Sequence, residues 1–204
     1  MREEGVPETV GPWRVNAART VYDNPWIRVI DHAVTHPDGT PGQYGVVRFK
    51  NRAIGILPID EEGFVYLVGQ HRFPSDAYSW ELPEGGGPAG EAPLDTAKRE
   101  LAEETGFSAK VWAPLIELDL SNSITDEVAI CYLACELEGG TAHPESSEAL
   151  QMRRIPFKML VNDVLEGRIR DSLTIVMALS AQARALRGEL PEVISNLILK
   201  GGSR

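Results

Sequence analysis

Cysteine is almost absent from this chain of 204 residues, which has only Cys131 and Cys135. Both lie in the segment AICYLACEL, whose apolar residues are typical of a buried strand. Four residues apart on one strand, they would share a face but lie too far apart for a disulfide. The segment offers no histidine with which they would form a metal site. We therefore expect two buried, free thiols.

Long apolar runs are also missing. No stretch of 18 consecutive apolar residues exists to form a membrane-spanning helix. The first residues, MREEGVPETVGPW, lack the apolar centre of a signal peptide. The sequence therefore predicts a cytoplasmic protein that has no membrane partner.

Positive charge is scarce, with 20 Lys and Arg against 30 Asp and Glu and a formal net charge of -10. This balance argues against binding nucleic acid through a broad basic face. An acidic site still binds phosphorylated molecules when divalent metal ions bridge the charges. The apolar content of 43% is ordinary for a globular protein, and the length suits one large domain, alone or with a small appendage.

The pattern of strands and helices indicates a mixed α/β protein. Residues 1–50 are expected to form a small antiparallel β unit after a loose arm, with turn residues at PDGTPG. A larger domain follows over residues 51–190, and 191–204 form a tail that packs or frays. Strands are expected at 53–59, 65–70, 109–120 and 127–137, and helices at 92–105, 155–167 and 171–188. This order favours helices on both sides of a sheet.

Three acids crowd one face of the first helix. Glu100, Glu103 and Glu104 have the i, i+3, i+4 spacing that brings side chains together. Such like charges destabilise a helix by a few tenths of a kcal/mol per pair, roughly. Taken alone, KRELAEE is more often a solvated charged face. The alternative is a site for a hard divalent cation, with Arg99 orienting the carboxylates.

The spacing around these acids favours the metal site. The segment GGGPAGEAPLDTAKRELAEETGF resembles the Nudix box at all nine specified positions: Gly85, Glu91, Arg99, Glu100, Leu101, Glu103, Glu104, Gly106 and Phe107. The resemblance implies a Nudix-type α/β/α sandwich with a mixed β-sheet, in which the box forms a loop-helix-loop. The antiparallel N-terminal unit would precede this domain.

The resemblance also implies a chemistry. Nudix hydrolases cleave a nucleoside diphosphate linked to another group, using Mg²⁺ or Mn²⁺. By similarity, Glu100 and Glu104 are the main metal ligands, and Glu103 is a third ligand or activates water. The backbone carbonyl of Glu84, just before the box, is a further ligand. Metal ions at such a site neutralise charge that develops on phosphate oxygens.

Further segments resemble the ADP-ribose and nucleoside-diphosphate-sugar pyrophosphatase branch. QHRFP followed by WELPEGG is similar to the branch pattern Q-aromatic-R-x-P and ELPAG, and GRIRDSLTIVMAL is similar near the C-terminus. The branch implies a homodimer built through the N-terminal strands, with both subunits lining each site. One departure stands at Asn122, where members that cleave ADP-ribose often have proline. A GDP-mannose-like or other nucleotide sugar therefore stays open as substrate.

Four residues are candidates for binding the substrate. Gln70 and Arg72 follow a strand, and arginine suits bidentate contact with phosphate; the alternative is a surface turn. Trp26 has the ring to stack on a nucleobase, or it packs in a core or dimer interface. Glu127 matches an acid of the branch. Glu81 is a candidate for supporting the metal site or tying down its loop.

The catalytic base is expected on a loop after the box. HPESSEALQ offers Glu145 and Glu148, and Glu148 aligns with the first acid of the branch pattern E-x-x-E. Gln151 replaces the second acid, and the alternative is an acidic loop without a catalytic role. A loop base that closes over substrate is physically reasonable. Glu103 is the remaining candidate.

The expected function is Mg²⁺-dependent hydrolysis of the pyrophosphate bond of a nucleoside diphosphate sugar, of the ADP-ribose or GDP-mannose type, to a nucleoside monophosphate and a sugar phosphate. One alternative is another Nudix substrate: a dNTP, a dinucleoside polyphosphate, NADH or coenzyme A. The other is a non-catalytic module that senses a nucleotide.

Overall fold

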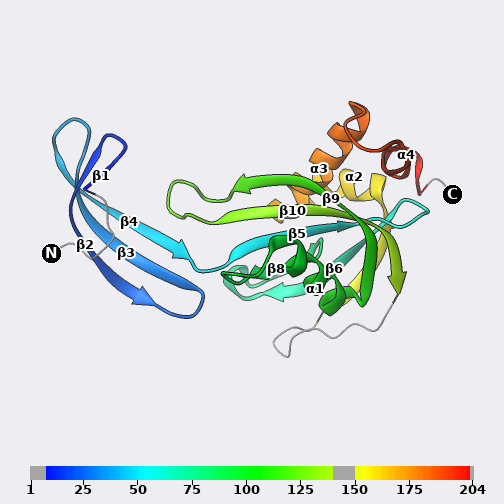
Figure 1. Cartoon of the computed structure of the whole chain (residues 1–204), viewed down its shortest axis with the longest axis horizontal. Helices are drawn as coiled ribbons and strands as arrows, with labels where there is room; N and C mark the ends of the chain where they lie inside the picture. Colours follow the sequence, from blue (N-terminus) through cyan, green and yellow to red (C-terminus); the bar gives the residue numbers. More distant parts are fainter. Residues whose placement is uncertain (1–7, 140–149, 203–204) are drawn as a thin grey trace. The chain divides into compact units, whose positions relative to one another are not determined.

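The structure is a computed structural model, and it describes residues 8–139 and 150–202. Its described part divides into two compact units. The first comprises the described residues up to Arg52 together with Asp119–Val128, and the second comprises Ala53–Leu118 and the described residues from Ala129 onwards. Figure 1 shows the elements of both in chain order.

The first unit is an antiparallel sheet in the order β1-β2-β3-β4. Its strands are β1 Thr9–Val10, β2 Trp13–Asp23, β3 Ile27–Thr35 and β4 Pro41–Phe49. The turn between β3 and β4 contains Gly39, whose positive φ of 88° suits glycine. Val15, Ala18, Ile30 and Val34 are buried in it. The expected antiparallel N-terminal unit is thus confirmed.

The segment Asp119–Val128 belongs to the first compact unit. The backbone N–H of Val47 donates to the carbonyl of Ile124 at 2.9 Å. The N–H of Phe49 donates to Asp126 Oδ1, also at 2.9 Å. Hydrogen bonds between residues so distant in sequence are not visible in local sequence patterns.

The second unit contains two sheets. One has the order β8-β5-β10-β9, and its central pair β5 and β10 is parallel. The other has the order β11-β6-β7 and is antiparallel. The strands are β5 Arg52–Pro58, β6 Phe64–Arg72, β7 Ala77–Glu81, β8 Glu84–Gly87, β9 Phe107–Asp119, β10 Val128–Gly139 and β11 Gln151–Pro156. The mixture of parallel and antiparallel pairs confirms the expected mixed sheet.

Among the described residues of the second unit there are four α-helices: α1 Pro93–Thr105, α2 Phe157–Leu165, α3 Ser172–Leu186 and α4 Glu192–Lys200. The first three match the expected helices closely. Pro93 starts α1, and Gly106 follows it with a φ of 72° that favours glycine. The fourth helix lies in the tail, for which the sequence left packing or fraying open. Its residues Ile194 and Ile198 are buried, so this segment packs.

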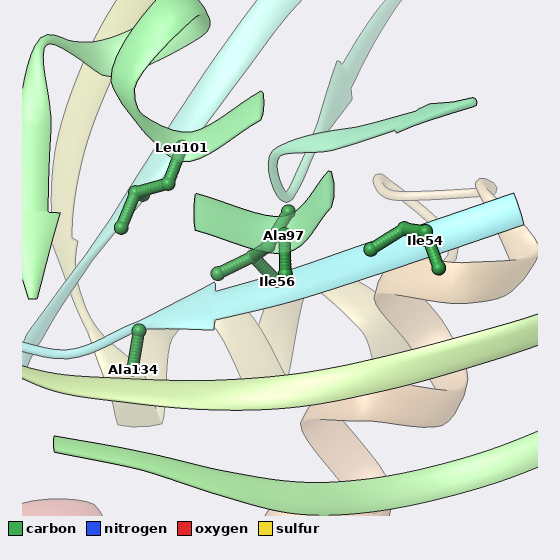
Figure 2. Close-up of a cluster of buried hydrophobic side chains, with 5 residues drawn as sticks. All are labelled: Ile54, Ile56, Ala97, Leu101 and Ala134. Carbon is green, nitrogen blue, oxygen red and sulfur yellow. The ribbon is translucent and has the colours of Figure 1, made fainter. Parts of the chain in front are cut away.

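Alternate residues of β5 face helices on opposite sides of the sheet. Ile54 and Ile56 form a buried cluster with Ala97 and Leu101 of α1, which Figure 2 shows together with Ala134. Gly55, between them, faces the other way. A Cβ added there would lie 2.9 Å from Met177 Cε of α3. Helices α1 and α3 therefore cover opposite faces, which confirms the expected α/β/α sandwich.

The two cysteines lie on β10 and are buried and free, as expected. Burial raises the pKa of each thiol to about 12. Both are therefore thiols, not thiolates, at neutral pH. Across the described ranges, every helix is too short or too polar to cross a membrane.

Candidate active site

The last turn of α1 is bonded to the start of β8. The backbone N–H of Glu84 donates to Oε2 of Glu104 at 3.1 Å. Glu104 is only 5% exposed, so its carboxylate points into the protein and not into solvent. A loop and most of α1 separate the two residues in the sequence, and the bond holds the start of β8 against the end of the helix. The box therefore comprises most of β8, a loop, α1 and the turn at Gly106, so it begins with a strand where the resemblance implied a loop.

Glu100 lies against the same stretch of backbone. A Cβ added to Gly85 would come closer than 3.0 Å to the Glu100 carboxylate. Only glycine fits this close approach. The carboxylates of Glu100 and Glu104 therefore meet beside the backbone of Glu84 and Gly85. This donor set contains only oxygen, which suits Mg²⁺ or Mn²⁺, so the residues fit the metal that the resemblance implied.

Arg99 holds the remaining box acids. Its Nη1 lies 2.9 Å from Glu100 Oε1 and 2.8 Å from Glu103 Oε2. Its Nη2 lies 3.4 Å from Glu91 Oε2 and donates to the carbonyl of Gly86 at 3.2 Å. Hydrogen bonds from Thr96 and from Arg99 lower the pKa of Glu91. Arg99 thus orients the acids around it, and an oxygen of Glu103 is engaged in this network.

Arg72, at the end of β6, is paired with two carboxylates. Its Nε donates to Oε1 and Oε2 of Glu81 at 3.1 and 3.0 Å, and its Nη2 also bonds Glu81. The same Nη2 donates to Oε1 of Glu84 at 2.6 Å. Glu81 is 3% exposed whereas the Arg72 side chain is 37% exposed, so the carboxylate of the pair is shielded from water and the arginine is partly accessible. Glu81 thereby ties the end of β7 to the end of β6.

The side chain of Glu84 and that of Asp171 are site residues that the sequence reasoning missed. One carboxylate oxygen from each of Glu81, Glu84 and Asp171 lies within 4.8 Å of the other two. Burial raises the pKa of Glu84 well above its usual value, and the charges of Asp171 and Glu81 raise it further, against the opposing effect of Arg72. The available signal was WELPEGG itself, because Glu84 stands where the ELPAG pattern has alanine.

Hydrogen bonds hold the turn between Glu81 and Glu84 in place. The N–H of Leu82 donates to Thr174 Oγ1 at 2.8 Å. The carbonyl of Pro83 accepts from the N–H of Ile56 at 2.8 Å. Asp171 caps α3 by accepting from the N–H of Thr174 at 2.7 Å. Strand β5 and the start of α3 therefore position both ends of the turn.

Three further candidates for substrate binding lie on β6 and in the first unit. Gln70 is half-buried on β6, opposite Ser79 of β7. Trp26 and Glu127 belong to the first unit, where Trp26 is 65% exposed. Burial raises the pKa of Glu127, and the neighbouring charge of Asp126 adds to the effect.

Two candidates for the catalytic base, Glu145 and Glu148, lie outside the described residues. The third, Glu103, is paired with Arg99.

An α/β/α sandwich with glutamates on a helix that follows a glycine-rich strand and loop is typical of a class of metal-binding hydrolases. Comparison with known proteins agrees with this. Residues 49–174, more than half of the chain, match the NUDIX domain family, and residues 13–47 match the nucleoside diphosphate sugar hydrolase N-terminal domain. The chain therefore belongs to the Nudix family, which confirms the family that the box indicated.

Several curated proteins are similar over much of their length. An ADP-ribose pyrophosphatase of Mycobacterium tuberculosis is 36% identical over 64% of this chain and 65% of its own, just under two thirds of that relative. A CMP-5'-(N-acetyl-N-hydroxy-3-aminopropyl)phosphonate hydrolase of Streptomyces rubellomurinus is 31% identical over 80% of this chain and 79% of its own. A solved structure titled as an ADP compounds hydrolase shares the fold, with a TM-score of 0.77 at 21% identity over 87% of this chain and 95% of that one.

Proposed function

We propose that this protein hydrolyses the pyrophosphate bond of a nucleoside diphosphate sugar, of the ADP-ribose or GDP-mannose type, and releases a nucleoside monophosphate and a sugar phosphate. The observation that carries the proposal is the meeting of Glu100 and Glu104 beside the Glu84–Gly85 backbone. Support comes from the match to a nucleoside diphosphate sugar hydrolase N-terminal domain and from the similar ADP-ribose pyrophosphatase.

The metal in this proposal is Mg²⁺ or Mn²⁺. Glu100 and Glu104 would hold it with the backbone carbonyl of Glu84, and Glu103 is a further candidate ligand. When bound, the ion supplies positive charge to the pyrophosphate oxygens and lowers the pKa of bound water. The task of Arg99 is to hold the Glu100 and Glu103 carboxylates in position through its two ion pairs.

The base that takes the proton from the attacking water is proposed to be Glu148. Glu145 lies on the same loop and is the second candidate. Glu103 is the third, and its pair with Arg99 at 2.8 Å favours an orienting role over proton transfer. A loop base suits this site because Glu100 and Glu104 are then left to bind metal.

Substrate contacts are proposed for Arg72, Gln70, Trp26 and Glu127. Arg72 is anchored by Glu81, which restricts its rotamers and so lowers the entropy cost of binding a phosphate. When a phosphate binds, the Arg72 guanidinium would either release Glu84 or contact Glu84 and the phosphate at the same time. Trp26 offers a largely exposed ring for a nucleobase.

We also propose a homodimer formed through the N-terminal strands. The first unit exposes apolar side chains, among them Val10, Val21, Tyr22 and Trp26. Such side chains favour an interface with a second copy. Light scattering on the purified protein would test this, and a monomer at micromolar concentration would refute it. A cytoplasmic location is proposed because both cysteines are free.

A second candidate is a different Nudix substrate. The Streptomyces relative, which matches 80% of this chain, is named for a compound in which CMP is joined to a phosphonate. Asn122 stands where ADP-ribose-cleaving members often have proline. Both observations favour widening the search beyond ADP-ribose, to nucleotide phosphonates, dNTPs, dinucleoside polyphosphates, NADH and coenzyme A.

A substrate panel decides between these candidates. The protein is incubated with Mg²⁺ and each compound, and the products are separated by ion-exchange chromatography. Nucleoside monophosphate and sugar phosphate from a nucleotide sugar support the first candidate. Faster turnover of a nucleotide phosphonate, a dNTP, a dinucleoside polyphosphate, NADH or coenzyme A supports the second. No product from any compound, together with tight nucleotide binding, would instead indicate a nucleotide-sensing module.

A further inference from the structure

The carboxylates of Glu81, Glu84 and Asp171 converge from three elements. Glu81 ends β7, Glu84 begins β8, and Asp171 caps α3. One oxygen from each lies within 4.8 Å of the others. Two ligands on opposite sides of a cation at about 2.4 Å are separated by about 4.8 Å, so the three oxygens fit around one divalent ion.

A buried oxygen of Glu84 is without a partner in this cluster. Its Oε1 accepts from Arg72, whereas Oε2 is inaccessible to solvent and accepts no hydrogen bond from any described residue. An unsatisfied buried carboxylate oxygen is costly, because it has lost water without gaining another donor. A cation among the three carboxylates would satisfy it.

The charges of the cluster also leave room for a divalent ion. With a metal ion bound in place of any proton, the three carboxylates carry three negative charges, and Arg72 supplies one positive charge through its pairs with Glu81 and Glu84. A single divalent cation would bring the sum to zero. This charge balance is important because an uncompensated charge is costly away from water, and Glu81 is 3% exposed and the Glu84 side chain 16% exposed.

We propose that Glu81, Glu84 and Asp171 bind a divalent metal ion at a site separate from the one formed by the Nudix-box glutamates. The two sites share Glu84, which gives its carboxylate to one and is expected to give its backbone carbonyl to the other. An ion in the new site therefore fixes the residue on which the box site depends. The proposal concerns metal binding, and it stands independently of which substrate is hydrolysed.

The test counts bound Mn²⁺ per chain by equilibrium dialysis without substrate. The box site is removed with the double variant Glu100→Gln and Glu104→Gln, in which glutamine still accepts from the Glu84 N–H. This variant should keep one ion per chain. Adding Glu84→Ala, the residue of the ELPAG pattern, should remove that ion. Glu62→Ala, an exposed acid outside the cluster, is the matched control and should leave the count unchanged.

A second variant keeps the test decisive if Glu84→Ala does not fold, which thermal melting would reveal. Asp171→Asn preserves the helix cap and removes one charge, and it should weaken Mn²⁺ binding in the box-deficient variant by roughly tenfold or more. The proposal is overturned if the box-deficient variant binds no ion, or if neither Glu84→Ala nor Asp171→Asn changes its binding. Substrate hydrolysis is not the readout, so failure here leaves the proposed function untouched.

Discussion

The carboxylate of Glu100 rests on the backbone of Gly85, so closely that a methyl group on Gly85 would overlap it. Gly85 is the first residue of the Nudix box and lies on β8, whereas Glu100 lies on α1. Their contact, with the Glu84–Glu104 hydrogen bond beside it, holds β8 against α1. Gly85 is therefore required because its missing side chain leaves room for the Glu100 carboxylate.

Gly85→Ala should displace Glu100 and lower kcat by on the order of 100-fold, because small misplacements of a metal ligand are costly. Circular dichroism should change little, since the rest of α1 packs through Ala97 and Leu101. Gly45→Ala is the matched control, because a Cβ there meets nothing within 4 Å. Equal activity of Gly85→Ala and the unmodified protein would contradict the close contact.

Glu104→Gln should lower kcat by orders of magnitude while the melting temperature stays within a few degrees. Glutamine keeps an oxygen that accepts from the Glu84 N–H, so the structural bond survives and only the charge is lost. Steady-state kinetics with saturating Mg²⁺ and a thermal melt measure the two effects. Unchanged activity would remove Glu104 from the metal site.

Glu148→Gln tests the proposed loop base. A base acts in the chemical step, so kcat should fall by about 100-fold or more while KM stays nearly constant. Glu145→Gln is the natural comparison because it lies on the same loop. If Glu148→Gln has little effect, Glu148 is not the base. The kcat values of Glu145→Gln and Glu103→Gln then identify which of these two residues is.

The sequence predicted the parts of the site that depend on local spacing and missed those that depend on long-range packing. The box placed Glu100, Glu103 and Glu104 on one helix because i, i+3 and i+4 always share a face. Asp171 was only the first residue of an expected helix at 171–188, because nothing in its own segment indicates that α3 begins beside Glu81 and Glu84. The pairing of β11 with β6 similarly joins strands that are far apart in the chain. Helix α4 was left open because short apolar tails give no sign of what they pack against.

The thiols of Cys131 and Cys135 should react very slowly with a thiol reagent at pH 8. Their pKa values of about 12 leave roughly one thiolate in ten thousand at that pH, and the thiolate is the reactive form. Reactivity should rise as pH increases toward 12 for as long as the fold persists. In denaturant both thiols should react quickly, which provides the control. Rapid reaction of the native protein at pH 8 would show that they are accessible.

Thr174→Val tests the hydrogen bond from the Leu82 N–H to Thr174, which holds the turn between Glu81 and Glu84. Valine matches the shape of threonine but cannot accept from the buried N–H of Leu82, which would lose its partner. The free energy of unfolding should fall by about 1–3 kcal/mol, measured by urea denaturation. Thr174→Ser keeps the hydroxyl and should retain the hydrogen bond, so it separates loss of the bond from loss of the methyl group. Because the turn positions Glu81 and Glu84, the valine variant should also lose Mn²⁺ affinity more than the serine variant. Equal stability of the two variants would mean that the Leu82–Thr174 bond contributes nothing to the fold.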